Sequence, residues 1–244
     1  MTKQRMGLLS ANQDDLILLT GVIGGAFLLI HVISALALKF SGENTSILLS
    51  GILLPIFAGV VMALLGAGHV LLTFAQAVRF SQTRRRALSL AAGQIGVECA
   101  LAVALCAGLS ALERAFAPVF WKWLIGAQTI TWGIGGRRIP EGSVWAPDLT
   151  ELFIEDFAIV WWGLPCIILG AAALGFIGGA IILRFGKRGG WAIWGAWMLG
   201  CLGLPRLPWR THEVTNVLIP ALIIAGVAAF LWSVWSLLRA VIRE

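Results

Sequence analysis

One acidic residue, Glu98, lies deep inside a long apolar stretch of the sequence. We predict a helix over residues 88–112, in which Glu98 is about ten residues, or about 15 Å, from the start. A carboxylate at that depth in a membrane costs several kcal/mol unless it is paired, hydrated or protonated. Gln94 is one turn earlier on the same helix face. The two side chains are therefore candidate contacts for a cation or a substrate. The alternative is that Glu98 fixes a helix contact through His31 or His69.

Basic residues gather in one short connection between two apolar stretches. Four arginines stand within eight consecutive residues, which are Arg79, Phe80, Ser81, Gln82, Thr83, Arg84, Arg85 and Arg86. Ser81 and Thr83 are possible helix caps. Such a connection offers a soluble partner a cationic contact, and the alternative is that the arginines bind anionic lipid headgroups. A smaller basic connection contains Arg184, Lys187 and Arg188.

The sequence contains no pattern of residues that is typical of catalysis or of metal binding. The three histidines are far apart, and there is no H-E-x-x-H, no G-x-S-x-G and no pair of intramembrane aspartates. The four cysteines lie in apolar stretches without C-x-x-C spacing, so we expect small buried apolar side chains. No Gly-Lys-Ser/Thr follows a glycine-rich segment. We therefore predict no catalytic residue, no metal and no cofactor bound by this chain.

Composition and hydropathy indicate an all-α membrane protein. Hydrophobic residues make up 59% of the 244 residues, charged residues make up 12%, and the mean hydropathy is +0.91. Several apolar runs exceed about 18 residues, and in lipid such runs satisfy their backbone hydrogen bonds as helices. The net charge of +6 comes from basic residues that flank these runs. This placement favours contact with membrane lipid and disfavours nucleic-acid binding.

We predict one transmembrane domain over residues 1–244. Its six spans are expected at about 16–38, 47–77, 88–112, 152–183, 190–204 and 217–238, with an outer loop at 113–151. With both termini in the cytoplasm, eleven of the 18 basic residues lie inside, which agrees with the positive-inside rule.

Two of the predicted spans have unusual lengths. The fourth would extend to about 50 Å, more than the roughly 30 Å hydrocarbon core, so we expect its acidic start to rise out of the bilayer. The fifth is short and ends at Pro205 and Pro208. This pattern predicts a broken or re-entrant outer hairpin between spans five and six. The alternative is a short tilted span in a thinned bilayer.

Three features resemble the small ABC-2 type permeases of bacteria. They are the end of the second span at 73–80, the basic connection at 81–87, and the third span that closes on Leu112 and Glu113. The connection at 184–188 and the short fifth span with its outer hairpin extend the resemblance.

This resemblance implies a multi-pass subunit of an ATP-binding-cassette exporter in the bacterial cytoplasmic membrane. Two such permease chains, alike or different, would pair with separate ATPase subunits, which bind ATP and Mg. The segment from Arg79 to Arg86 would be the ATPase-coupling loop, and Arg184, Lys187 and Arg188 would form a second cytoplasmic contact. Gln94 and Glu98 would lie on the translocation path of a peptide, lipid-like or drug substrate.

Two other classes of function stay open. One is a nucleotide-independent binding or immunity protein, which would sequester a membrane-active peptide at a tryptophan-rich outer surface. The other is an intramembrane enzyme that uses Glu98 with a histidine. The absence of a recognisable catalytic pair places the enzyme last.

Overall fold

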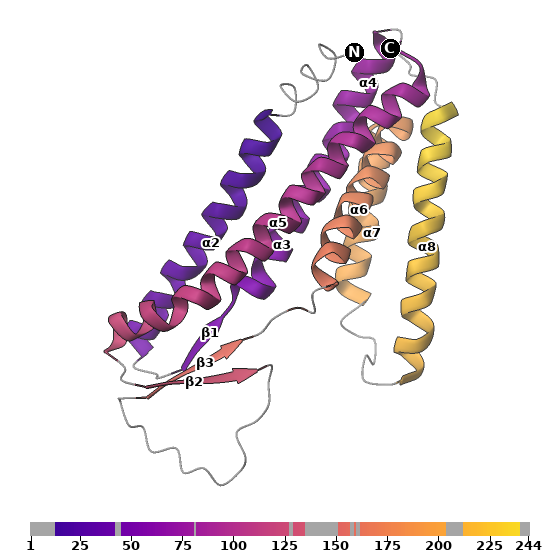
Figure 1. Cartoon of the computed structure of the whole chain (residues 1–244). Coiled ribbons are helices and arrows are strands. Elements are labelled where there is room, and N and C mark those ends of the chain that lie inside the picture. Colours follow the sequence, from indigo (N-terminus) through magenta and orange to yellow (C-terminus); the bar gives the residue numbers. More distant parts are fainter. Residues whose placement is uncertain are drawn as a thin grey trace. The chain divides into compact units, whose positions relative to one another are not determined.

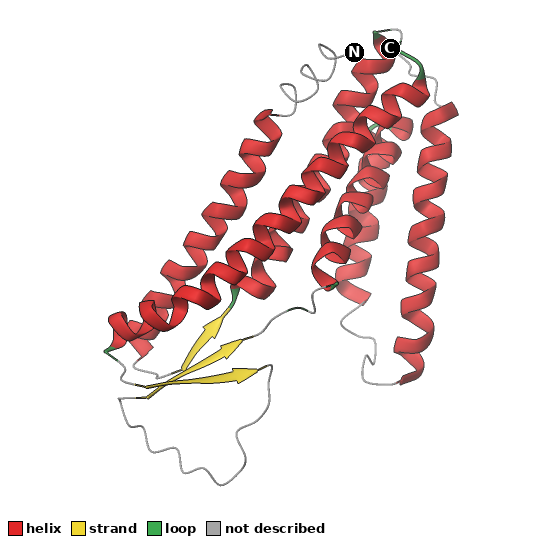
Figure 2. Ribbon diagram, viewed as in Figure 1, coloured by secondary structure: helices red, strands yellow, loops and turns green. Residues whose placement is uncertain are grey.

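The computed structural model describes residues 13–41, 45–80, 82–126, 129–134, 151–156, 159, 162–203 and 212–239. Seven α-helices, one π-helical segment and three strands occur in this part of the chain (Figure 1), and Figure 2 shows the same elements coloured by type. Five helical segments are long and apolar enough to cross a membrane. These five correspond to the predicted spans one, two, three, four and six. The prediction of a multi-pass helical membrane protein is therefore confirmed.

The chain divides into two compact units, and the dividing points lie within three of its helices. Unit 1 comprises Met1–Val61 and Glu98–Ile168, and unit 2 comprises Met62–Val97 and Leu169–Glu244.

Unit 1 contains the first helix and a small sheet. Its elements are α2 (Gln13–Ser41), β1 (Thr45–Leu48), the start of α3 (Ser50–Gly68), the later part of α5 (Arg84–Ile125), β2 (Thr129–Ile134), β3 (Glu151–Asp156) and the first residues of α6 (Gly163–Phe185). Helix α2 begins three residues before the predicted span, with Asp14 and Asp15 in its first turn. Carboxylates stabilise this end of a helix because they oppose its dipole.

The three strands form a parallel sheet in the order β1-β3-β2, which the sequence analysis did not predict. Ile154 of the central strand is fully buried and packs with Leu48, Ala117 and Trp121. The predicted start of span four at residue 152 is wrong, since β3 occupies 151–156 and α6 begins only at Gly163. The 23 residues of α6 match the hydrocarbon thickness at about 34 Å. The acidic residues at the start of the predicted span four are thus outside helix α6.

Helix α5 is longer than predicted. It runs for 42 residues from Arg84 to Ile125, or about 63 Å, so residues 113–125 continue the helix and do not begin an outer loop. Trp121 is 2% exposed because it packs on the sheet, whereas Trp123 is 79% exposed. The first part of the predicted outer loop thus belongs to the same helix as the third span.

Unit 2 contains the remaining helices. They are the end of α3, the π-helical segment η1 (His69–Phe74), α4 (Ala75–Arg79), the start of α5, most of α6, α7 (Lys187–Gly203) and α8 (His212–Arg239). The segments α3, η1 and α4 together form the second spanning segment, Ser50–Arg79. Helix α7 has 17 residues and corresponds to the short fifth span. The predicted hairpin at 204–211 and both chain termini lie outside the described residues.

Helices α3 and α6 approach one another closely at three glycines. A Cβ atom on Gly66 would lie 2.6 Å from the Ala172 carbonyl oxygen, and one on Gly179 would lie 2.9 Å from the Ala67 carbonyl oxygen. A Cβ on Gly175 would overlap the backbone of Ala63. Small residues at such positions let membrane helices pack through their backbones.

A buried cluster joins four segments of unit 2. Val70 and Phe74 of η1, Ala87 of α5, Phe176 and Ala180 of α6, and Leu237 of α8 make up this cluster. It packs the start of α5 and the end of α8 against η1 and α6, at the end of unit 2 that carries the basic connections.

Candidate functional site

The connection between α4 and α5 is short and closed by backbone hydrogen bonds. The amide of Phe80 donates to the Gln76 carbonyl at 2.9 Å, and the amide of Gln82 donates to the Ala77 carbonyl at 3.1 Å. The Thr83 carbonyl accepts from the Ala87 amide at 2.9 Å, so Thr83 is the residue that opens α5. The other proposed cap, Ser81, lies outside the described residues.

Arg84 joins this connection to the end of α8. Its Nη1 donates a hydrogen bond to the Leu238 carbonyl oxygen at 3.1 Å. Leu238 is in the last turn of α8, where carbonyl groups have no partner within the helix. A cation also interacts favourably with the negative end of the helix dipole. Arg84 therefore caps α8 from the first residue of α5.

The connection between α6 and α7 is a tight turn at Gly186, which has φ of +58°. Its amide donates to the Ile182 carbonyl at 2.7 Å, and its carbonyl accepts from the Gly189 amide at 3.0 Å. A Cβ on Gly189 would lie 2.7 Å from the Ile181 carbonyl oxygen. Both glycines are thus required by the geometry of this turn.

Arg184 joins this second connection to α8. Its Nη1 donates to the Ser236 hydroxyl at 2.8 Å, and Ser236 is 1% exposed. Its guanidinium carbon lies 5.4 Å from the ring centroid of Trp232, which stacks against Phe185 at 6.4 Å. These contacts are a hydrogen bond and a cation–π interaction. Both basic connections are consequently fixed to the same helix.

The remaining cations at this end of unit 2 are exposed. We name this set the basic platform, and it consists of Arg79, Arg85, Arg86, Lys187, Arg188 and Arg239. Residues 75–90, 183–190 and 236–239 contain no acidic residue. The predicted coupling loop and the predicted second contact thus each contain one arginine bound to α8 beside exposed cations. Arg84 and Arg184 are anchors, whereas the others are exposed, and among them Arg239 lies over the Trp235 ring at 4.4 Å.

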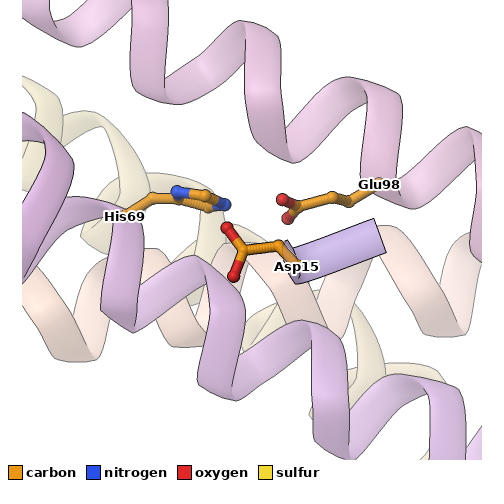
Figure 3. Close-up of side chains that lie close together, drawn as sticks. All are labelled: Asp15, His69 and Glu98. Atoms are coloured by element: carbon orange, nitrogen blue, oxygen red, sulfur yellow. The ribbon is translucent and has the colours of Figure 1, made fainter. Parts of the chain in front are cut away.

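The predicted polar residues of α5 are buried. Glu98 is fully buried, and Gln94 is 9% exposed. The Glu98 carboxylate lies within 4.8 Å of the carboxylate of Asp15 in unit 1 (Figure 3), a partner that the sequence analysis missed. Figure 3 also draws His69, which belongs to unit 2, where its Nδ1 is 3.2 Å from the Thr73 hydroxyl. Two carboxylates this close can share a proton or contact one cation.

A second polar pair in unit 1 joins α2 to α5. The Nε2 atom of His31 lies 3.3 Å from Oε1 of Glu113, and Nδ1 of His31 lies 2.9 Å from the Phe27 carbonyl oxygen. Glu113 is 6% exposed. Glu113 closes the predicted third span, and no role is predicted for it from the sequence. A predicted third helix that reached residue 125 would place Glu113 within a long helix, next to aromatic residues.

This pair lies in a cavity of about 390 Å³. The cavity also contains five aromatic side chains, which are Phe27, Phe116, Phe120, Trp121 and Trp123. Unit 2 has a cavity of about 430 Å³ between α6 and α8, and it is lined only by apolar residues and glycines. The unit 1 cavity therefore combines apolar volume with a charged group, which is the usual composition of a small-molecule site.

Comparisons with known proteins give no match to this chain, whether to a family model, a curated protein or a solved structure. Among the described residues, two arrangements have clear chemistry. The basic platform suits an acidic protein surface or phosphate groups. The aromatic cavity with Glu113 suits an apolar ligand that carries a positive charge.

Proposed function

We propose that the chain is the membrane-spanning permease subunit of an ATP-binding-cassette exporter in a bacterial cytoplasmic membrane. It would pair with a second permease chain, either a copy or a homologue, and with ATPase subunits that bind ATP and Mg. The observation that carries this proposal is the fixing of both basic connections to α8, while the cations of the basic platform stay exposed.

Orientation supports a cytoplasmic partner. Arginine and lysine near span ends collect on the cytoplasmic side, so the acid-free end of unit 2 is expected there. ATP is available on that side. An ATPase with an acidic groove would be attracted to the basic platform by charge complementarity.

The anchoring contacts give the connections the stiffness that mechanical coupling needs. An ATPase that changes shape moves membrane helices only if the segment it contacts is fixed to them. Arg84 ties the start of α5 to α8, and Arg184 ties the end of α6 to α8. A displacement of either connection would therefore be passed to α8. Lipid anchoring, the alternative for these arginines, requires charge and no such fixed geometry.

Affinity purification in mild detergent tests this proposal directly. The double variant Arg85→Glu/Arg86→Glu reverses two exposed charges and leaves the anchor Arg84 in place. The control Lys39→Glu/Lys122→Glu reverses two exposed charges in unit 1. We expect an ABC-type ATPase to co-purify with the wild type and with the control, and to be lost from the platform variant.

The opposite outcome would be informative. If no ATPase co-purifies with the wild type while the membrane oligomer stays intact, the permease proposal is wrong. The nucleotide-independent binding protein then becomes the better account of the chain.

A further inference from the structure

We propose that the unit 1 cavity binds an amphipathic organic cation, with the apolar body of the ligand among the aromatic rings and its charge at Glu113. As a statement about transported substrate, this inference rests on the exporter function proposed above. As a statement about binding, it rests only on the cavity. The two can therefore be tested separately.

The aromatic wall of the cavity is well organised for such a ligand. Trp121 is 2% exposed and meets Phe120 edge to face, with ring centroids 4.9 Å apart. Phe27 packs on the His31 ring with centroids 4.3 Å apart. Phe116 and Trp123 also line the cavity and are exposed. These rings supply apolar contact, and their faces attract positive charge.

Hydrogen-bond chemistry shows that the His31–Glu113 pair holds one exchangeable proton. The Phe27 carbonyl can only accept, so Nδ1 of His31 must carry a hydrogen. A neutral imidazole with hydrogen on Nδ1 has only a lone pair on Nε2. The contact between Nε2 and Oε1 of Glu113 thus needs one more proton, either on Nε2 or on the carboxyl group. A ligand cation could take the place of this proton.

Charge favours a cation over an anion or a neutral lipid chain. Glu113 and His31 are the only ionisable side chains that line the cavity within the described part of the chain, and no lysine or arginine joins them. The nearby cations Arg114 and Lys122 are exposed and do not line the cavity. An alkyl chain would gain nothing from Glu113, and it would find an equally large apolar space in unit 2. A buried carboxylate beside aromatic rings is best used by a desolvated organic cation.

Binding of matched hydrophobic ions to the purified full-length chain tests the inference. Tetraphenylphosphonium and tetraphenylborate have nearly the same shape and opposite charge. We expect saturable binding of radiolabelled tetraphenylphosphonium in detergent, displaced by unlabelled cation and not by tetraphenylborate. Glu113→Gln keeps the side-chain size and should weaken cation binding by about tenfold or more.

Two further variants separate a lost site from a misfolded protein. Asp14→Asn removes an exposed acid outside the cavity and should bind as the wild type does. Val119→Trp adds bulk from a lining side chain that is 69% exposed, so it should fill part of the cavity without altering the pair. Cation binding should fall in Val119→Trp as well. Equal binding of both ions, or wild-type binding by a folded Glu113→Gln variant, would overturn the inference. Since no ATPase is present, failure here leaves the permease proposal untouched.

Discussion

The guanidinium of Arg84 donates a hydrogen bond to the backbone carbonyl of Leu238, which is 154 residues away in sequence. This contact closes the end of α8 with the first side chain of α5. It gives one arginine of the basic connection a structural role that its exposed neighbours Arg85 and Arg86 do not share. A partner that binds the exposed arginines would thus contact a segment already fixed to the helices.

Replacing Arg84 with alanine should destabilise the protein. The substitution removes a charge-assisted hydrogen bond and leaves a terminal carbonyl of α8 without this donor, at a cost of about 1 to 2 kcal/mol. Arg85→Ala is the matched control and should change stability by less than about 0.5 kcal/mol, because Arg85 is exposed. Thermal unfolding of the detergent-solubilised variants measures both values. Equal stability of the two variants would contradict the anchoring role.

Arg184→Lys should separate charge from geometry. Lysine keeps the positive charge but loses the planar guanidinium near Trp232. Because Arg184 is exposed, we expect the interaction with Trp232 to contribute only about 0.5 kcal/mol. A double-mutant cycle of Arg184→Lys with Trp232→Leu measures this coupling. Strict additivity of the two single variants would show that the ring contact contributes nothing.

Gly175→Ala should destabilise the α3–α6 contact even though alanine favours helices. A Cβ at this position overlaps the Ala63 backbone, and separating two packed helices costs about 1 to 3 kcal/mol. Gly170→Ala on the same helix meets no atom within 4 Å. It should stabilise the protein by up to about 1 kcal/mol through helix propensity alone. We expect the two substitutions to shift the thermal unfolding temperature in opposite directions. A stabilising Gly175→Ala would refute the close approach of α3 and α6.

Most spanning helices could be predicted from hydropathy, because lipid forces every long apolar run into a helix. The ends were harder to predict. The predicted span four includes 152–162 because Phe153 and Ile154 continue an apolar average, yet these residues suit a strand equally well and pair with β1 and β2. Strand pairing between distant segments leaves no local signal in a hydropathy profile.

The candidate sites could likewise be predicted only in part from the sequence. A run of arginines marks the basic connection in the sequence, but the contact of Arg84 with Leu238 depends on a helix that lies 154 residues away. Likewise, His31 and Glu113 are unremarkable singly, and only the packing of α2 on α5 makes them a pair. Residue type could therefore indicate the location of charge, whereas tertiary contacts decide which charges are anchors.

Cysteine labelling should establish the orientation of α5. Trp123 lies 39 residues after Arg84 on one helix, or about 58 Å, well beyond the thickness of the hydrocarbon core. In a background with all four native cysteines replaced, Trp123→Cys should react with an impermeant maleimide added to intact cells. Lys187→Cys on the basic platform should react only after permeabilisation. Labelling of Lys187→Cys in intact cells would reverse the proposed orientation.

The most direct test of the permease proposal is photocrosslinking from the basic platform in native membranes. A benzophenone amino acid replaces the exposed Arg86, and the same group at exposed Lys122 in unit 1 serves as the control. The proposal predicts that mass spectrometry identifies an ABC-type ATPase crosslinked to position 86 and absent from position 122. Adducts of position 86 with lipid alone, in membranes where the protein is intact and abundant, would contradict it.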